Sequence, residues 1–263
     1  NLYCMLVKIV IYTLAYMINM MKKLSTYLLA VYLFAACTPQ QQSTTVNFKG
    51  YQIEKKAKTD SALVAMLAPY SDSINKTMNL VIGFSTKGLT KKQPEGELGN
   101  FMADCMREMA EQKFGKKVDA AFINYGGIRS YIPKGDITVG KIYELMPFDN
   151  IVVLQEVKGT ILKLFLNRVA EKGGWPLSGL TMKIKDKKPD QVLIAGNPIE
   201  DNAVYTIANS DYIANGGDDC DMLRVLPQIN KGYLLRDALI EYIKQITKQG
   251  KPIDWKVEGR VTY

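Results

Sequence analysis

Residues 118–129 constrain the fold of this chain more than any other stretch. The apolar run at 118–123 has the length and composition of a buried strand, and Asn124-Tyr125-Gly126-Gly127-Ile128-Arg129 follows it directly. Two glycines allow a sharp turn and let backbone N–H groups approach a ligand closely. Arg129 then offers a planar guanidinium that suits a phosphate or a carboxylate. The stretch predicts either an anion-binding corner at a strand end or a plain turn with a surface arginine.

A second corner of the same kind follows another predicted strand, at residues 204–209. There the chain reads Asp211-Tyr212-Ile213-Ala214-Asn215-Gly216-Gly217-Asp218, which places a carboxylate to accept hydrogen bonds from hydroxyl groups. Between the two corners, Met146-Pro147-Phe148-Asp149-Asn150 precedes a predicted strand at 151–157. An aromatic ring in such a loop can form one wall of a slot for a flat ring.

Hydrophobic periodicity supplies the remaining elements. Apolar residues recur at helical spacing in residues 61–78, 98–114, 159–170 and 234–248, and Gly115 is expected to end the second of these helices. Further strands are predicted at 79–85, 181–185 and 191–195. Lys183, Lys185, Lys187 and Lys188 alternate with apolar residues there, as on the solvated face of a hairpin. Strands and helices mix without strict alternation, which predicts an α+β layered fold with one domain over residues 47–263.

Taken in order, these motifs resemble the C-terminal domain of the 5′-nucleotidase family, from about residue 95 to residue 263. Each motif is short, and the resemblance depends on all of them occurring in the family's order. They are Glu97-Leu98-Gly99-Asn100 with Ala103-Asp104, the Asn124–Arg129 segment, Gly135-Asp136-Ile137-Thr138, Pro147-Phe148-Asp149-Asn150, Val157-Lys158-Gly159, Leu177-Ser178-Gly179-Leu180, and Tyr212 through Asp218.

The resemblance implies a role for each matching residue. Two aromatic rings sandwich the nucleobase, and Phe148 and Tyr212 stand at those positions, with tyrosine in place of the usual phenylalanine at the second. Asp218 matches the residue that binds the ribose hydroxyls, and Arg129 matches one that grips phosphate. The full substrate-binding set expected is Asn124, Gly126, Gly127, Arg129, Phe148, Asn150, Tyr212, Gly216, Gly217 and Asp218.

One position departs from the family pattern. Relatives often carry another phosphate-binding arginine shortly before the Leu-Gly-Asn motif, whereas this chain reads Lys91-Lys92-Gln93-Pro94-Glu95. A lysine there could act as a point charge, but the bidentate grip of an arginine would be lost.

The 263 residues contain no histidine. The family cleaves phosphate esters with a separate metallophosphatase domain that holds two metals through aspartate, asparagine and several histidines, and such a site cannot be assembled here in that manner. We therefore expect no catalytic residue, no metal and no cofactor in this chain. Divalent metals are expected only in a separate metallophosphatase partner. Asp218, Asp219 and Asp221 could offer oxygen ligands to Mg²⁺ or Ca²⁺, although their spacing matches no familiar metal loop.

The N-terminal region has the form of a bacterial lipoprotein signal. Met21-Lys22-Lys23 is basic, residues 24–36 are apolar, and Phe34-Ala35-Ala36-Cys37 ends in the cysteine that would be lipidated. An ordinary signal peptide or an N-terminal membrane anchor is the alternative. We expect residues 1–20 to be an upstream extension outside the mature protein, residues 21–37 to be the signal, and residues 38–46 to be a polar tether. This predicts a lipid-anchored protein of the cell envelope, at the periplasmic or outer-membrane surface.

The net charge indicates which ligands the chain could bind, and the cysteines raise the question of a disulfide or a reactive thiol. The formal net charge of +8 suits an anionic ligand, but the lysines are scattered and form no stripe, so no nucleic-acid partner is expected. Cys105 and Cys220 could pair in an oxidising compartment, or Cys105 could be a small core residue. Three aspartates around Cys220 should raise its pKa and disfavour a nucleophilic thiolate.

The sequence thus predicts nucleotide recognition for 5′-nucleotidase-type phosphate ester hydrolysis in nucleotide catabolism, with catalysis supplied by another polypeptide. The alternative is a nucleotide- or nucleoside-binding lipoprotein without a hydrolytic role.

Overall fold

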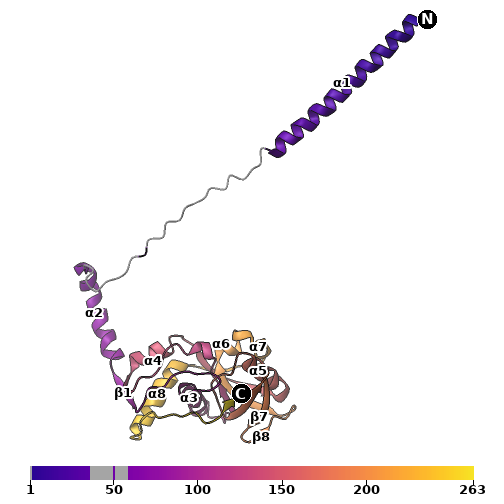
Figure 1. The fold of residues 1–263 in the computed structure, drawn as a ribbon. Coiled ribbons are helices and arrows are strands. Elements are labelled where there is room, and N and C mark those ends of the chain that lie inside the picture. The colour runs from indigo at the N-terminus through magenta and orange to yellow at the C-terminus, as the bar shows by residue number, and fades with distance from the viewer. Residues whose placement is uncertain (1, 36–49, 51–58) are drawn as a thin grey trace. The chain divides into compact units, whose positions relative to one another are not determined.

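The computed structural model describes residues 2–35, residue 50 and residues 59–263, and it divides into two compact units at about residue 58. In the first unit, residues 2–35 form the helix α1 (Leu2–Ala35), which runs through position 21 without a break (Figure 1). In the described part of the chain, no helix is both long and apolar enough to cross a membrane. Cys37 and the predicted tether lie outside the described residues, so the expected boundaries at 20, 37 and 46 stay predictions.

The second unit is a mixed α+β fold, as predicted. Its helices are α2 (Ser61–Met78), α3 (Glu97–Phe114), α4 (Val139–Leu145), α5 (Gly159–Glu171), α6 (Asp211–Ala214), α7 (Asp221–Arg224) and α8 (Leu235–Lys248), with short 3₁₀ turns η1 (Tyr125–Gly127) and η2 (Gly217–Asp219). Its strands are β1 (Val81–Ser85), β2 (Ala120–Phe122), β3 (Gly135–Thr138), β4 (Ile151–Lys158), β5 (Leu177–Ser178), β6 (Leu180–Lys185), β7 (Lys188–Ile194), β8 (Asn197–Pro198), β9 (Val204–Ser210), β10 (Ile229–Leu234) and β11 (Val261–Thr262).

The main sheet has five strands in the order β10-β4-β9-β2-β5. Strand β9 runs antiparallel to β4 and parallel to β2, with Asn209 opposite Val153 and Ala208 opposite Ala121. A four-stranded sheet has the order β11-β6-β7-β8, and β1 pairs with β3 in a two-stranded ribbon. The fold is therefore a layered one, organised around a mixed sheet.

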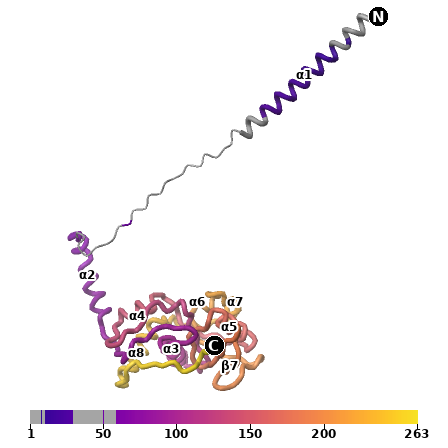
Figure 2. Tube along the Cα trace, in the orientation of Figure 1, coloured from indigo at the N-terminus to yellow at the C-terminus, as the bar shows by residue number. Residues whose placement is uncertain are grey.

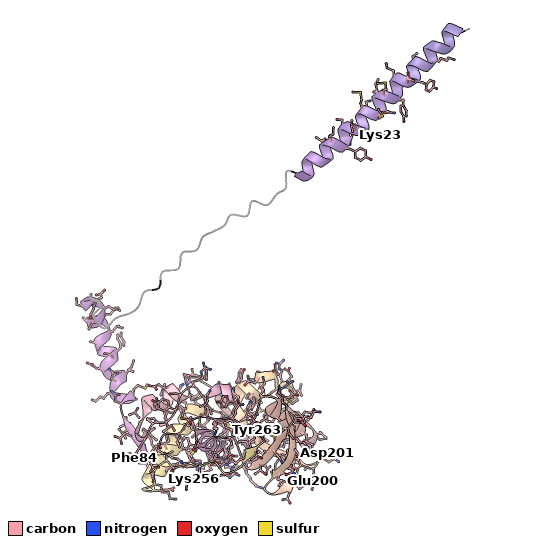
Figure 3. The ribbon with its side chains drawn as sticks, in the orientation of Figure 1. Lys23, Phe84, Glu200, Asp201, Lys256 and Tyr263 are labelled. Atoms are coloured by element: carbon pink, nitrogen blue, oxygen red, sulfur yellow. The ribbon has the colours of Figure 1, made fainter. Side chains whose placement is uncertain are left out.

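Two hydrophobic cores cover the two faces of the main sheet. Ala121 and Ile123 point into the core that α3, α4 and α8 share, whereas Ala120 and Phe122 point into the core beneath α5. This follows from the alternation of side chains along a strand. Trp175 is buried in the second core and packs edge-on against Phe165. Side chains fill the space between the elements of this unit (Figure 3).

The segment after α8 closes the domain. It runs past α3 to the C-terminus (Figure 2), and the Asn100 amide donates a hydrogen bond of 2.9 Å to the carbonyl of Lys256. Trp255 packs edge-on against Phe101 at 5.1 Å between ring centroids. The last strand, β11, then pairs in parallel with β6.

Most predicted elements are confirmed, with differences at the strands. The four predicted helices occur, and Gly115 ends α3 in the left-handed conformation at φ 65°. The strand predicted at 118–123 is shorter: β2 covers only Ala120–Phe122, which pairs with β9 on one side and with β5 on the other. In the predicted hairpin, Met182 and Ile184 are buried while Lys183 and Lys185 are exposed, as expected.

Candidate functional site

Three loops meet at one end of the central strands of the main sheet. Because β2 and β9 are parallel, their carboxyl ends lie side by side, and the segments after Phe122 and Ser210 emerge together. Strand β4 is antiparallel to β9, with Val152 opposite Ser210, so the loop that precedes β4 lies at the same end of the sheet. The topology therefore brings together three motifs that are far apart in the sequence.

The first loop is a 3₁₀ turn whose backbone carbonyls are hydrogen-bonded by a lysine. The N–H of Gly127 donates to the carbonyl of Asn124 at 3.0 Å. The Lys91 ammonium donates to the carbonyls of Ile128 and Tyr125 at 2.8 and 3.3 Å, and lies 4.4 Å from the centroid of the Tyr125 ring. Burial, with repulsion from Arg129 second, lowers the pKa of Lys91. Two of its three donors are thus used to hold the turn.

A carboxylate on the second loop is bound to the first loop. Asp218 accepts a hydrogen bond from the Asn124 amide at 2.9 Å and one from the Tyr212 hydroxyl at 3.3 Å. Asp218 itself has a left-handed backbone, with φ 55° and ψ 36°, a conformation that aspartate tolerates better than most residues. The carboxylate therefore faces the cavity with its position fixed from two sides.

The second loop differs from the prediction in one respect. The strand β9 does not pass directly into the Gly-Gly turn, because the helix α6 lies between them and is capped by the Ser210 hydroxyl. Tyr212 is the second residue of this helix. A β-carbon on Gly217 would lie 2.5 Å from the Tyr212 ring, so only glycine allows the ring to pack there.

The third loop carries Phe148 and is held by an arginine that the sequence analysis did not identify. Arg236, in α8, donates to the Phe148 carbonyl at 3.2 Å and to the Asp149 carboxylate at 2.7 Å. Its guanidinium is buried and lies 4.3 Å from the centroid of the Tyr143 ring. It is 88 positions from Phe148 in the sequence, so local patterns gave no signal for it.

The three loops enclose a cavity of about 420 Å³. Eight of the ten predicted residues line it: Asn124, Gly126, Gly127, Arg129, Phe148, Asn150, Tyr212 and Asp218. Phe148 and Tyr212 are about half exposed, and in the described part of the chain their rings make no aromatic contact with each other. The Arg129 guanidinium lies 5.8 Å from the centroid of the Phe148 ring. Gly216 and Gly217 line an adjoining open hollow, together with Asn150 and Tyr212.

Comparison with known proteins identifies the family. Residues 74–224 match the family model described as 5′-nucleotidase, C-terminal domain. The chain belongs to the 5′-nucleotidase C-terminal domain family. This confirms the resemblance inferred from the motifs.

Full-length relatives place the match in context. A 5′-nucleotidase of Vibrio vulnificus is 29% identical over 225 residues, which cover 80% of this chain and 39% of that protein. Protein UshA of Yersinia enterocolitica is 29% identical over 78% of this chain and 38% of that protein. The crystal structure of a 5′-nucleotidase precursor from Thermus thermophilus superposes with a TM-score of 0.67 at 28% identity, over 76% of this chain and 42% of that one. The chain thus spans about two fifths of the length of these relatives.

Three aspartates near the Gly-Gly turn of the second loop contact separate partners. Asp219 pairs with Lys172 at 3.0 Å and Asp221 pairs with Arg224 at 2.8 Å, while Asp218 faces the cavity. Among the described residues, no group of three or more His, Cys, Asp or Glu side chains is arranged to hold a metal ion. The three carboxylates thus contact three different partners.

Neither cysteine of the domain is disulfide-bonded. Cys105 lies in the hydrophobic core that α3 shares with α4 and α8, and Cys220 lies in the core on the other face of the main sheet. Both are buried free thiols. The core role considered for Cys105 is therefore the one observed. Burial, with Asp218 second, raises the pKa of Cys220 to about 12, so the expected direction is confirmed with burial as the larger cause.

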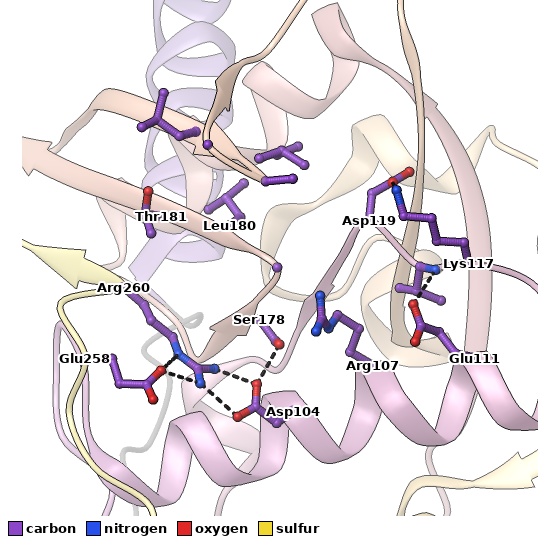
Figure 4. A pocket seen from close by; sticks show the side chains of 16 residues that line it. Asp104, Arg107, Glu111, Lys117, Asp119, Ser178, Leu180, Thr181, Glu258 and Arg260 are labelled. Atoms are coloured by element: carbon purple, nitrogen blue, oxygen red, sulfur yellow. Dashed lines mark hydrogen bonds and ion pairs between the residues drawn. The ribbon is translucent and has the colours of Figure 1, made fainter.

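A second cavity, of about 510 Å³, lies between α3 and the β6–β7 hairpin (Figure 4). Its most buried charges are paired: Arg260 donates to both Asp104 oxygens at 2.7 and 2.8 Å and also pairs with Glu258. The Ser178 hydroxyl and the Trp255 indole complete the hydrogen bonds to Asp104, at 2.6 and 2.8 Å. This cluster ties the C-terminal segment to α3 and β5, and we assign it a structural role.

Proposed function

We propose that this nucleotidase domain recognises nucleotides for 5′-nucleotidase-type phosphate ester hydrolysis, and that a separate metallophosphatase polypeptide supplies the catalytic metals. One observation carries the proposal: two half-exposed aromatic rings, a fixed carboxylate and an arginine line the same cavity. Its volume falls within the range of small-ligand sites, about 300–1,000 Å³.

In this proposal each group binds a different part of the ligand. The base stacks between Phe148 and Tyr212, where ring faces offer dispersion and offset stacking. The Asp218 carboxylate accepts hydrogen bonds from the ribose hydroxyls, and Arg129 pairs with a phosphate. Arg129 is exposed, and within the described residues its guanidinium donates one hydrogen bond, to the Gly126 carbonyl at 3.3 Å, so most of the guanidinium donors are free for a ligand.

The role of the chain would then be to position the phosphate ester. Holding the base and ribose fixes the scissile bond relative to the metals of the partner, and such positioning lowers the entropic barrier to reaction. The 263 residues contain no histidine, and imidazole is the commonest metal ligand in such sites, so this proposal assigns the metals to residues of the partner. We further propose that Cys37 is lipidated and that the protein is held at the cell envelope.

Isothermal titration calorimetry of the mature chain with AMP, adenosine and inorganic phosphate tests the recognition step. We expect AMP to bind, adenosine to bind more weakly, and AMP to remain intact in the presence of the isolated chain. Hydrolysis of AMP should require a histidine-containing metallophosphatase from the same organism and should be faster with this chain than without it. Hydrolysis by the isolated chain, or no AMP binding at all, would contradict the proposal.

A second function shares the same binding step. A nucleotide- or nucleoside-binding lipoprotein without a hydrolytic role would bind AMP equally well through the same cavity. It differs in that no phosphatase would hydrolyse AMP faster in its presence.

A further inference from the structure

The helix α2 exposes an apolar stripe that nothing in the domain covers. None of its 18 residues is buried. Because an α-helix turns through about 100° per residue, Leu63, Leu67, Tyr70 and Ile74 fall on one face, and each of the four is about half exposed or more. The spacing between them is the repeat of a helix that packs along a partner.

The charged residues of α2 lie on its other face. Asp72 and Lys76 are the charged positions within the helix, and both project away from the stripe at this helical spacing. A helix that lies on a membrane surface usually carries several lysines or arginines beside its apolar face. The composition of α2 instead favours a protein groove that accepts an uncharged helix face.

A helix of this kind gains little from its own sequence. Pro69 lies inside α2 and has no N–H to donate to the preceding turn. Most helical stability in proteins comes from packing of the apolar face and not from intrinsic propensity. The exposed stripe therefore indicates a contact surface for another molecule.

The base of α2 is joined to the nucleotide cavity through α4. A β-carbon on Gly140 would lie 3.1 Å from the carbonyl of Met78, and the N–H of Val139 donates to the carbonyl of Leu80 at 3.0 Å. At the other end of α4, the carbonyl of Leu145 accepts a hydrogen bond from the N–H of Arg129 at 3.0 Å. The loop with Phe148 follows directly. A molecule bound on α2 would thus be connected, through α4, to two of the three cavity loops, those with Arg129 and Phe148.

We infer that the stripe Leu63, Leu67, Tyr70 and Ile74 is the docking surface for the catalytic metallophosphatase. This inference rests on the proposed function and names where the partner binds. The match to the family's C-terminal domain begins at residue 74, inside α2, and the relatives are more than twice as long as the part that this chain covers. The matched domain is described as a C-terminal one, so the remaining residues of a relative precede it in sequence, and α2 is the first helix of this domain. A separate catalytic subunit would bind at this helix.

Site-specific photo-crosslinking in the cells that produce the protein tests this surface. The full chain would carry a benzophenone amino acid at Leu67, on the stripe, or at Asp72, on the opposite face, as the matched control. We expect the probe at position 67 to yield an adduct with a histidine-containing metallophosphatase, identified by mass spectrometry, and the probe at position 72 to yield at least tenfold less. An adduct with a second copy of this chain, equal adducts from both positions, or no protein adduct would each overturn the inference.

A binding assay separates this inference from the proposed function. Leu67→Glu should leave the AMP affinity and the thermal stability of the isolated chain unchanged, because no residue of α2 is buried. The same variant should lower partner-dependent AMP hydrolysis at least tenfold, whereas Asp72→Asn should not. If the wild-type chain binds AMP but Leu67→Glu retains full partner-dependent hydrolysis, the docking surface is wrong and the recognition role stands. If the chain does not bind AMP, the proposed function fails first.

Discussion

At the scale of single residues, Asp218 has the most constrained position in the candidate site. Its backbone is left-handed, and its two carboxylate oxygens accept hydrogen bonds from Asn124 and Tyr212. A ligand with two vicinal hydroxyls can donate to the lone pairs that remain, since a carboxylate accepts about four hydrogen bonds. The carboxylate thus couples the first loop, the second aromatic ring and the proposed ribose.

Removing either end of the proposed nucleoside contact should weaken binding. Asp218→Ala removes the acceptor for the ribose hydroxyls, and Phe148→Ala removes one stacking face. Each is expected to reduce AMP affinity by about 1–3 kcal/mol in calorimetric titration. Phe84→Ala is the matched control, because Phe84 is similarly exposed, lies on β1 (Figure 3) and does not line the cavity. Unchanged affinity in both site variants would show that the pocket is assigned wrongly.

The glycines of the two corners have different roles, which alanine substitution can separate. A β-carbon on Gly217 would lie 2.5 Å from the Tyr212 ring and 2.6 Å from its carbonyl, so Gly217→Ala should displace the ring and lower both the melting temperature and AMP affinity. A β-carbon on Gly126 would meet nothing closer than 3.9 Å. Gly126→Ala should leave the melting temperature unchanged and weaken AMP binding only through contact with the ligand. A lower melting temperature for Gly126→Ala would contradict this distinction.

At the scale of elements, the loop between α4 and β4 is held by a helix from the far end of the chain. Arg236→Met should release the Phe148 carbonyl and the Asp149 carboxylate, which we expect to lower the free energy of unfolding by about 1–3 kcal/mol in denaturant titration. The affinity for AMP should fall as well, because Phe148 loses its support. Arg236→Lys should recover part of the stability but not the two-pronged contact. A variant with full AMP affinity and reduced stability would limit Arg236 to a structural role.

The helices that were predicted correctly have apolar residues at helical spacing over several turns. Residues 98–114 and 234–248 repeat apolar side chains over several turns, and α3 and α8 occupy these positions. The short helices α4, α6 and α7 were not predicted, because four to seven residues are too few to show a helical period. They matter for the site, since α6 presents Tyr212 and α4 leads to Phe148.

The residues that line the candidate site could be predicted, because they belong to short local motifs. The residues that support its loops could not, because they are far from those loops in the sequence. Eight of the ten predicted residues line one cavity because family motifs mark the loops themselves. Lys91 and Arg236 support those loops from other parts of the chain, through hydrogen bonds to backbone carbonyls. Every residue has a backbone carbonyl, so the sequence does not show which carbonyl a distant side chain contacts. These two supporting residues could be identified only once the fold was known.

At the scale of the whole molecule, a largely shielded ion pair connects α3 to the C-terminal segment of the domain. Asp104 in α3 accepts hydrogen bonds from Arg260, Trp255 and Ser178, so the C-terminal segment and the edge strand β5 are fixed to the same helix (Figure 4). The side chains of Asp104 and Arg260 are only 15% and 13% exposed, so solvent screens the pair weakly. Removing one partner of such a pair leaves a buried charge without compensation.

This ion pair should make stability fall in acid. Burial disfavours the charged form of Asp104, but the hydrogen bonds and attraction from Arg260 outweigh it and lower the pKa of Asp104. Because the folded-state pKa lies below the unfolded-state value of about 3.9, the pair stabilises the fold fully above that pH. The contribution is lost as the pH falls through the folded-state pKa. Asp104→Asn should therefore lower the free energy of unfolding by about 3 kcal/mol at pH 7, and the difference from wild type should shrink below about pH 4.

Denaturant titrations of wild type and variant between pH 7 and pH 2.5 measure this difference directly. Asp201→Asn is the matched control, because Asp201 pairs with Lys163 on the surface with its side chain 60% exposed. Exposed pairs contribute little, so the control should stay within about 1 kcal/mol of wild type at every pH. A penalty for Asp104→Asn that stays constant from pH 7 to pH 2.5 would mean that lost packing, and not the charge of Asp104, explains the effect. In that case the closure of the domain by its C-terminal segment would not depend on the ion pair.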